Sequence, residues 1–500
     1  MTFSSLRRIV GLSLFALAMS CSWSNLSMAE TRLLVGAAQT DITPPTGFPM
    51  AGYYHERLAE GTIDPLLAKA LVFDQGDVRT AMVVCDLIGI SRDLCLEVRR
   101  RASKATGIPE QFIAVSGTHS HTAPDYTRRL VQTLENSRAG KTSEGQSEVD
   151  AYPEKLIQGI ADAVIEANRC RAPVTLAIGT GEQSPQVSFN RRFIVRDGST
   201  QTWRNFSDKN VVRSAGPIDP ELSVATFVDE AGKAQAVLSN FALHLDTVGG
   251  MRWSADYPGF IAAGVRKNHG SDVVSIFGTG CCGDINHVDP RSTERNKTDF
   301  IGNSIAASLE SVLSHMQPVE ETRLAAHSTV VNLPLQEVSA EDISRSVQLM
   351  ELIRNGGKVE FLDHVRAYKQ LITAQFRSEA NLDMAKRELG WGRSLAWAGI
   401  GDSLPVDVQT ITIGSDLAIV FLPGEIFTEL GLAIKQASPF NQTVVIELSN
   451  AVETIYVPTR SACVGGSYEV TNSTVKPGAG ELLVEAALGL LKESANAGKK

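Results

Sequence analysis

The chain has 500 residues, of which 43% are hydrophobic and 21% charged, and this ordinary globular composition excludes a fibrous or disordered protein. The formal net charge is −9. No basic stripe of the kind that binds polyanions occurs in the sequence, so nucleic acid is excluded as an expected partner. The length permits one large domain or several smaller ones.

Residues 1–29 are typical of an export signal. Arg7 and Arg8 precede the short apolar run Ile9–Met19, and Ser27-Met28-Ala29 ends in the small residues that a signal peptidase needs. The run is too short to span a bilayer. A second interpretation places cleavage before Cys21, with a lipid on its sulfur. We therefore expect an exported protein, periplasmic or secreted, in a free or a lipid-anchored form.

One local pattern recurs after the signal: an apolar run, a loop rich in Gly, Pro, His and Asp, and often a helical pattern. This alternation predicts an α/β domain over residues 30–500, in which helices cover a mixed sheet. In such folds polar site residues gather in the loops beyond the strand ends. The predicted strands are Ala81–Cys85, Phe112–Val115, Ala236–Leu243, Val273–Phe277 and Leu417–Leu422.

Two segments depart from this pattern. Ala340–Leu389 is charged, poor in Gly and helix-periodic, which predicts a helical insertion. Thr127–Val149 is polar and rich in Ser and Gly, which predicts a mobile surface loop that could act as a lid.

Three predicted strand ends carry residues suited to metal binding. His119 and His121 are spaced as alternate residues at the end of one strand, so both rings could face one site. His244 ends a second strand, and Glu425 follows a third. A lone histidine at a strand end is more often structural, but this combination favours a metal. Imidazoles and a carboxylate suit zinc, which activates water for hydrolysis.

The chain also resembles the neutral/alkaline, non-lysosomal ceramidases, through short motifs that are weak singly but occur in the family's order. The matching segments are Val35–Pro44 with Met50–Tyr53, Thr118-His119-Ser120-His121 for the family's Thr-His-Thr-His, Asn190-Arg191 for Asn-Arg, His244 for its second histidine, Gly283-Asp284-Ile285-Asn286 for Gly-Asp-Val-Ser, Pro423-Gly424-Glu425, Tyr456-Val457-Pro458-Thr459 for Tyr-Val-Thr-Thr, and Tyr468-Glu469 for Tyr-Glu.

The resemblance implies a zinc amidohydrolase that cleaves an N-acyl lipid such as N-acylsphingosine, with peripheral membrane contact. It implies that His121 moves protons and that Arg191 donates to a developing oxyanion, although Arg191-Arg192 could also be a surface basic pair. It leaves the oligomeric state open. The implied zinc ligands are His119, His244, Glu425 and Tyr456, and the implied substrate-side residues are His121, Arg191 and Tyr468.

The chain departs from the family in two respects. Asn286 stands where the family has a serine beside the metal, and an amide can neither attack as a nucleophile nor shuttle a proton. Full ceramidases continue into a C-terminal immunoglobulin-like domain, which we do not expect after the last predicted helix, Glu481–Glu493. Two alternatives therefore stay open: an exported zinc hydrolase of a non-sphingolipid amide or ester, and a catalytically silent, metal-containing binding protein.

The vicinal pair Cys281-Cys282 precedes Asn286 and allows three interpretations. A cysteine thiolate is a good zinc ligand. The pair could instead be buried, or one member could form a disulfide with Cys463. We favour a structural role, because the ligand set implied by the resemblance already fills the metal.

Overall fold

The computed structural model describes residues 32–141 and 147–497. Every element below belongs to one compact unit that begins at Arg32. The predicted export signal over 1–29, with the alternative lipid site at Cys21, lies outside the described residues. Within the described ranges, no helix is long and apolar enough to cross a membrane.

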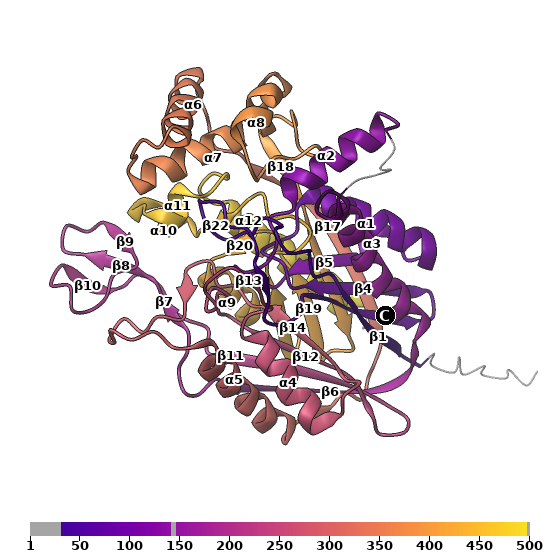
Figure 1. The fold of residues 1–500 in the computed structure, drawn as a ribbon. Coiled ribbons are helices and arrows are strands. Elements are labelled where there is room, and N and C mark those ends of the chain that lie inside the picture. The colour runs from indigo at the N-terminus through magenta and orange to yellow at the C-terminus, as the bar shows by residue number, and fades with distance from the viewer. Residues whose placement is uncertain (1–31, 142–146, 498–500) are drawn as a thin grey trace, which may run out of the picture. The chain divides into compact units, whose positions relative to one another are not determined.

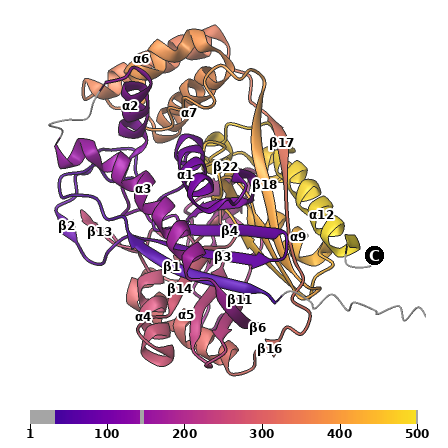
Figure 2. The ribbon, with the colours of Figure 1, turned by 90° about the vertical axis from the view of Figure 1, so that its right-hand side faces the viewer.

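Two β-sheets pack face to face at the centre of this unit (Figures 1 and 2), and their inner faces share one core of Val, Ile, Leu and Phe side chains. The larger sheet has the order β14 (Val274–Thr279), β12 (Ala234–Phe241), β11 (Glu221–Asp229), β6 (Ala172–Glu182), β1 (Leu34–Asp41), β3 (Leu67–Gln75), β4 (Val78–Cys85) and β5 (Ile113–Gly117), with β16 (Gln317–Pro318) beside β6. The smaller sheet has the order β17 (Leu324–Pro334), β18 (Ser403–Ile413), β19 (Leu417–Phe421) and β21 (Gln442–Ile446).

Helices cover the outer faces of both sheets, which gives four layers. On the larger sheet, α1 (Arg92–Thr106) and α3 (Glu148–Arg169) cover one half, and α4 (Pro258–His269) and α5 (Thr298–Leu313) cover the other. On the smaller sheet lie α9 (Thr428–Ala437) and α12 (Ala479–Ala497). Strands buried on both faces read as continuous apolar runs, as β4 does. The predicted α/β fold with a mixed sheet is confirmed.

Three strand–helix–strand units supply the parallel pairs of these sheets: β4–α1–β5, β12–α4–β14 and β19–α9–β21. The first unit shows how the sequence sets such a connection. Ser91 caps α1 by accepting a hydrogen bond from the Leu94 backbone N–H, and Gly107 ends the helix at φ +75°.

Buried amides join the carboxyl ends of the two sheets. The Asn450 side chain accepts from the Val115 N–H at 3.0 Å and donates to Gln409 Oε1 at 2.8 Å. The Asn240 side chain donates to the Val445 carbonyl of the smaller sheet at 3.0 Å. Buried polar groups need such partners, so these bonds hold the loops at the strand ends in a defined relative position.

The predicted helical insertion over residues 340–389 is confirmed. It consists of α6 (Ala340–Arg354), α7 (Phe361–Arg377), the short 3₁₀ turn η2 (Glu379–Asn381) and α8 (Leu382–Glu388). Ser339 and Asp342 form a capping box at the start of α6. α7 is the helix that docks the insertion, because its buried face joins the core of the smaller sheet.

The remaining elements are short and lie mostly around the strand ends. A second excursion holds β7 (Phe189–Asn190), β8 (Arg192–Val195), β9 (Thr200–Thr202) and β10 (Val211–Ser214), of which β8, β9 and β10 form a small sheet of their own (Figure 1). The others are β2 (Gly61–Thr62), η1 (Glu110–Phe112), β13 (Arg252–Trp253), β15 (Ile285–Asn286), β20 (Glu425–Ile426), β22 (Tyr456–Val457), α10 (Arg460–Gly465) and α11 (Tyr468–Thr471).

The prediction of a loop over Thr127–Val149 is wrong for most of that segment. Residues Thr127–Arg138 form α2, α3 begins at Glu148, and residues 142–146 lie outside the described part of the chain. The apolar face of α2 is narrow: Leu130 and Val131 are buried and Leu134 packs beside them. The abundant polar residues conceal this face in the sequence.

The cysteine pair is structural in the sense expected. Cys281 and Cys282 are buried free thiols, and Cys463 is half-buried and also free. No disulfide forms among the cysteines of the described residues, so the alternative pairing with Cys463 does not occur.

Candidate metal centre

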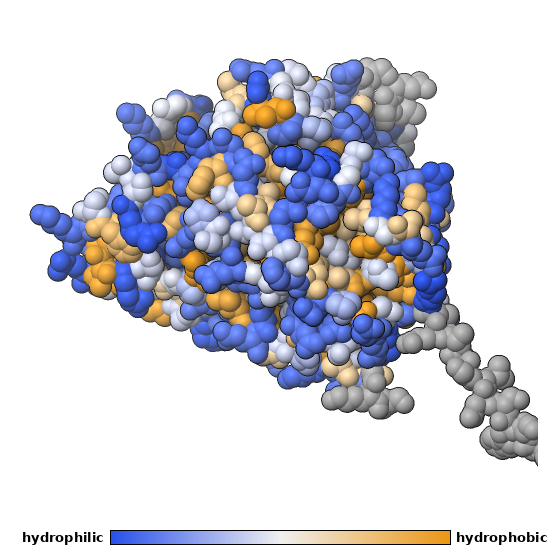
Figure 3. Space-filling model, turned by 90° about the horizontal axis from the view of Figure 1, so that it is seen from below, coloured by the Kyte–Doolittle hydropathy of each residue, from blue (hydrophilic) through white to orange (hydrophobic). Residues whose placement is uncertain are grey.

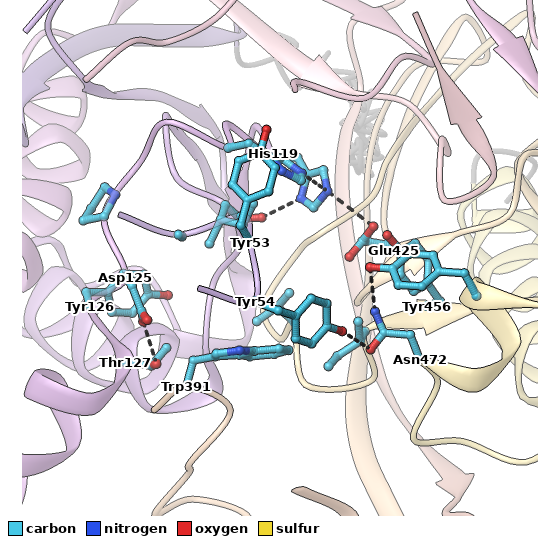
Figure 4. Close-up of a pocket in the computed structure, with 18 residues that line it drawn as sticks. Tyr53, Tyr54, His119, Asp125, Tyr126, Thr127, Trp391, Glu425, Tyr456 and Asn472 are labelled. Carbon is cyan, nitrogen blue, oxygen red and sulfur yellow. Dashed lines mark hydrogen bonds and ion pairs between the residues drawn. The ribbon is translucent and has the colours of Figure 1, made fainter. Parts of the chain in front are cut away.

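His119, His244 and Glu425 meet at the carboxyl ends of three strands. His119 follows β5, His244 follows β12, and Glu425 begins β20 just after β19. The Nε2 atoms of the two histidines are 2.9 Å apart. Glu425 Oε2 lies 3.3 Å from Nε2 of His119 (Figure 4). It lies 3.7 Å from Nε2 of His244. All three side chains are buried, with at most 5% of each residue exposed.

The hydrogen bonds of these residues leave donor atoms that suit a metal ion. His119 Nδ1 donates to the Ile88 carbonyl at 2.7 Å, and His244 Nδ1 donates to the Cys282 carbonyl at 3.4 Å. In the neutral form that these bonds select, each Nε2 presents a lone pair toward the other across 2.9 Å, so a cation or a proton held between them would stabilise the contact. Glu425 Oε2 is buried and has no hydrogen-bond partner. With His121, whose Nε2 is 3.4 Å from that of His119, the histidines form a cluster that could bind a metal.

The backbone around the cluster is strained or tightly packed. His119 adopts φ +77°, a left-handed conformation that costs a residue with a side chain on the order of 1–3 kcal/mol and that persists mostly at functional sites. Gly424 also has a positive φ, and a Cβ there would meet Thr454 Oγ1 at 2.0 Å, so only glycine fits before Glu425. These two turns aim the ligand side chains inward.

His119 and His121 approach each other for a reason other than the one expected. Neither lies on the strand, because β5 ends at Gly117. Both lie in the following loop, where their rings meet edge to face with centroids 4.9 Å apart. The turn at His119, and not the alternation of a strand, brings the rings together.

Arg191 is held rigidly beside the cluster. Its Nε donates to Glu469 Oε1 at 2.8 Å, and its Nη2 donates to the Gly283 carbonyl and to the Tyr456 hydroxyl, each at 2.9 Å. Its Nη1 lies 3.5 Å from His244 Nε2, on the metal side. Arg191 is only 4% exposed, so the interpretation as part of a surface basic pair is wrong.

The two tyrosines lie next to these charged groups. Tyr456 pairs with Glu425 in the parallel ladder of β20 and β22, and its ring centroid is 5.5 Å from that of Tyr468. The Tyr468 hydroxyl accepts from Asn472 Nδ2 at 3.0 Å, and Asn472 Oδ1 accepts from the Tyr54 hydroxyl at 3.1 Å (Figure 4). Burial raises the pKa of Tyr456 well above its ordinary value.

Burial, together with the neighbouring charges, keeps the imidazoles of His121 and His244 neutral. Burial, reinforced by His119, lowers the pKa of His121 to about 4 and that of His244 well below its usual range. Burial also opposes charge on His119, but the Glu425 carboxylate outweighs it and raises the His119 pKa. Burial opposes ionisation of Glu425 as well, yet His119 and Arg191 hold the pKa of Glu425 below normal. Neutral imidazoles and an ionised carboxylate are the forms that bind a metal.

A narrow, mostly apolar cavity of about 130 Å³ opens at the cluster. Gly52, at φ +99°, lets the chain pass close to His121, because a Cβ there would lie 2.8 Å from that side chain. Trp391, which follows the helical insertion, closes one side (Figure 4). The cavity wall includes Tyr53, Tyr54, Ile88, His119, His121, Tyr126, Trp391, Glu425, Val452, Ile455, Tyr456 and Tyr468.

Asn286 is not part of this wall. It belongs to β15, which pairs with β7, and it is not among the residues that line the cavity. Its side-chain oxygen accepts a hydrogen bond from the backbone N–H of Val288 at 3.1 Å. The amide is therefore engaged in holding its own turn.

The roles of two acidic groups behind the cluster, Glu469 and Glu447, were not foreseen. Glu469 carries the charge that balances Arg191, and the Tyr-Glu motif could have revealed it. Cys282 Sγ lies 3.0 Å from Glu447 Oε1 and 3.8 Å from His244 Nδ1, on the side of that ring away from the cluster. Burial raises the pKa of Glu447 well above normal. No sequence signal marks Glu447, because it is a single acid at the end of a strand.

Comparisons with known proteins agree on one family. A family model described as neutral/alkaline non-lysosomal ceramidase, N-terminal, matches residues 33–286. Neutral ceramidase 3 of Arabidopsis thaliana is 26% identical over 222 residues, which are 43% of this chain but only 27% of the relative. The crystal structure of neutral ceramidase from Pseudomonas aeruginosa matches with a TM-score of 0.66 at 18% identity, over 93% of this chain and 75% of that one. A ceramidase complexed with C2 matches at the same TM-score and identity, over 93% and 76%. At this identity the structural matches establish a shared fold.

Proposed function

The chain belongs to the neutral/alkaline non-lysosomal ceramidase family, and from this premise we propose that it is a zinc-dependent amidohydrolase of an N-acyl lipid such as N-acylsphingosine. The observation that carries the proposal is the buried convergence of the Nε2 atoms of His119 and His244 on Glu425 Oε2, at 2.9 Å from each other and at 3.3 Å and 3.7 Å from that oxygen. Such a donor set suits zinc, which takes nitrogen and oxygen ligands. A zinc ion bound there supplies Lewis acidity and lowers the pKa of bound water to ~7.

His119, His244 and Glu425 are the proposed ligands, and Tyr456 is the proposed fourth. The parallel pairing of Tyr456 with Glu425 supports this assignment, because it keeps the two side chains adjacent. His121 is the competing fourth ligand, since its Nε2 lies 3.4 Å from that of His119. The nearby cysteines are poorer candidates, because Cys282 contacts the far nitrogen of His244.

The other polar residues act on the substrate in this proposal. Arg191, whose Nη1 faces the cluster, stabilises negative charge on the amide oxygen. The Tyr468 hydroxyl, held by Asn472, is a second donor to the same oxygen. His121 has an unpartnered, buried Nδ1 and holds or moves a proton near the leaving nitrogen. Asn286 contributes only to the local backbone.

The apolar cavity wall favours a lipid-like substrate over a polar one. Two alternatives have a specific motive. Asn286 in place of the family's serine favours a non-sphingolipid amide or ester, and a metal centre without turnover would make the protein a binding module. We also keep the proposal that the protein is exported, on the strength of residues 1–29.

Elemental analysis combined with an amide and ester screen tests all three. We expect one zinc per chain in the wild type, most of it lost in His244→Ala. The matched control is His269→Ala, because His269 pairs with Glu310 at 3.2 Å on the surface of α4. A wild type without stoichiometric metal contradicts the proposal. Metal without turnover of any substrate supports the binding module, and turnover confined to small amides or esters supports the second alternative.

A further inference from the structure

Two exposed aromatic residues, Trp203 and Phe361, have no role in the proposed chemistry and form a cluster with the proposed donor Tyr468. Trp203, Phe361 and Tyr468 contact one another, with ring centroids 4.7 Å apart for Trp203 and Tyr468, 5.7 Å for Phe361 and Tyr468, and 6.0 Å for Trp203 and Phe361. The rings of Phe361 and Tyr468 are stacked. We refer to these three residues as the aromatic platform.

The platform is assembled from three distant segments. Trp203 follows β9 on the β8–β10 excursion, Phe361 is the first residue of α7, and Tyr468 is the first residue of α11; Figure 1 shows these elements next to one another. Trp203 is 52% exposed and Phe361 43% exposed. Trp203 also has φ +60°, a strained conformation for a bulky residue. Exposed aromatic rings held in this way are typical of binding surfaces.

Exposure by itself would not single out these residues. Figure 3 shows other hydrophobic patches scattered among hydrophilic residues on the face seen from below, as is normal for a protein surface. What distinguishes the platform is its continuity with the cavity. Tyr468 lines the cavity and touches Tyr456, while Phe361 contacts Tyr54, whose ring lies 6.4 Å from that of Trp391. Ring contacts therefore lead from the surface to the metal centre.

The size of the cavity decides what the platform could bind. At about 130 Å³, it is slightly smaller than an engineered cavity of about 150 Å³ that admits benzene, a ligand of about six carbon atoms. A longer alkyl chain that begins at the metal centre must leave through the mouth. The platform is an apolar surface in ring contact with the cavity wall.

We propose that the aromatic platform is a substrate subsite for one extended alkyl arm of an N-acyl lipid, beyond the carbons that fill the cavity. This inference rests on the proposed function, and it applies to an alkyl arm on either the acyl or the amine side. Each methylene that leaves water on binding strengthens affinity about fourfold. Rigid aromatic rings provide this contact at low cost in conformational entropy.

Kinetics with three amides test the subsite and identify the arm. The substrates are N-acetyl-4-nitroaniline with two short arms, N-dodecanoyl-4-nitroaniline with a long acyl arm, and N-acetyldodecylamine with a long amine arm. We expect Trp203→Ala to raise KM about fifteenfold for one long-arm substrate, a loss of about two buried methylenes, and to leave the short substrate unchanged. The matched control is Phe206→Ala, because Phe206 is 45% exposed on the same excursion but packs on Phe193.

An effect of Trp203→Ala that is equal for all three substrates, or absent from all three, overturns the subsite. An effect of the same size in Phe206→Ala also overturns it, because a general loss of surface apolar area would then explain the result.

A binding measurement separates this inference from the proposed function. ω-Bromododecanoic acid and ω-bromododecylamine carry a heavy-atom quencher at the end of each kind of arm. We expect saturable quenching of tryptophan fluorescence by one of them, and a clear share of it is lost in Trp203→Phe. Trp253 and Trp397 are buried, whereas Trp391 lines the cavity and retains its own share of the quenching in this variant. Quenching that depends on Trp203 in a protein without amidase activity would remove the proposed function and keep the subsite. Hydrolysis of amides without any quenching that depends on Trp203 would keep the proposed function and remove the subsite.

Discussion

Glu469→Gln tests whether Arg191 is positioned by a buried charge. Glu469 is fully buried, and its Oε1 accepts a hydrogen bond from Arg191 Nε at 2.8 Å. Its Oε2 accepts from Thr202 Oγ1 at 2.7 Å and lies 3.3 Å from Arg192 Nε. The carboxylate thus balances two buried guanidinium groups. The glutamine side chain keeps the shape and one acceptor but removes the charge.

The structure sets the expected loss in the free energy of unfolding and the expected fall in kcat. Breaking a buried ion pair by removing one partner costs about 3–5 kcal/mol, and the oxygen that glutamine retains places this variant at the lower end, near ~3 kcal/mol. Arg191 keeps its bonds to Gly283 and Tyr456, so the guanidinium should shift without leaving the site. Loss of one oxyanion donor costs about 10²–10³ in kcat, and for a shifted donor we expect a fall toward ~10².

Urea unfolding followed by circular dichroism, together with kcat on the best substrate from the screen, measures both quantities. The matched control is Asp219→Asn, because Asp219 forms a mostly buried ion pair with Lys435 of α9 at 2.7 Å. The control should lose stability and keep its turnover. A Glu469→Gln variant within about 1 kcal/mol of the wild type in stability, or one with unchanged kcat, would refute the reasoning.

Three further predictions concern single groups in or near the site. Tyr456→Phe should lose most activity with an unchanged unfolding midpoint if its oxygen is a metal ligand, and unchanged turnover would assign Tyr456 to packing. Burial raises the pKa of Glu453 to about 7, from about 4.3 in an unfolded chain; the folded state then binds the proton more tightly, so the associated stability is present below pH ~4.3 and is lost as pH rises through ~7. Glu453→Gln should flatten the decline in the unfolding midpoint over roughly that interval, and an unaltered pH profile would show that Glu453 is ionised throughout. Because Asn286 holds its own turn and does not line the cavity, Asn286→Ser should leave the turnover of a short-chain N-acylsphingosine close to that of the wild type; a clear rise in this variant would show that residue 286 acts on the substrate.

Local patterns in the sequence were sufficient to predict the helical insertion, several strands and the kinds of residue in the site. The helical insertion could be predicted because its periodicity records which face of each helix is buried. His119, His244 and Glu425 could be singled out because together they offer two imidazoles and a carboxylate after three separate apolar runs, and site residues gather in the loops beyond strand ends. The helix α2 was missed because only Leu130, Val131 and Leu134 reveal its apolar face.

The geometry of the site depends on contacts that no local pattern contains. The distance of 2.9 Å between His119 and His244 follows from the turn at φ +77° and from the way buried amides join the two sheets. The Tyr-Glu motif contained Glu469, but only the fold shows that it faces Arg191.

The aromatic platform could not be predicted from local sequence patterns. Trp203, Phe361 and Tyr468 are ordinary aromatic residues in their own segments, and nothing in their spacing relates them. Periodicity reports the burial of a residue relative to its own helix or strand, whereas contact between remote segments is set by how the sheets and excursions pack. The residue types that could bind a metal were therefore readable from the sequence, while their convergence and the surface that leads to them were decided by the tertiary structure.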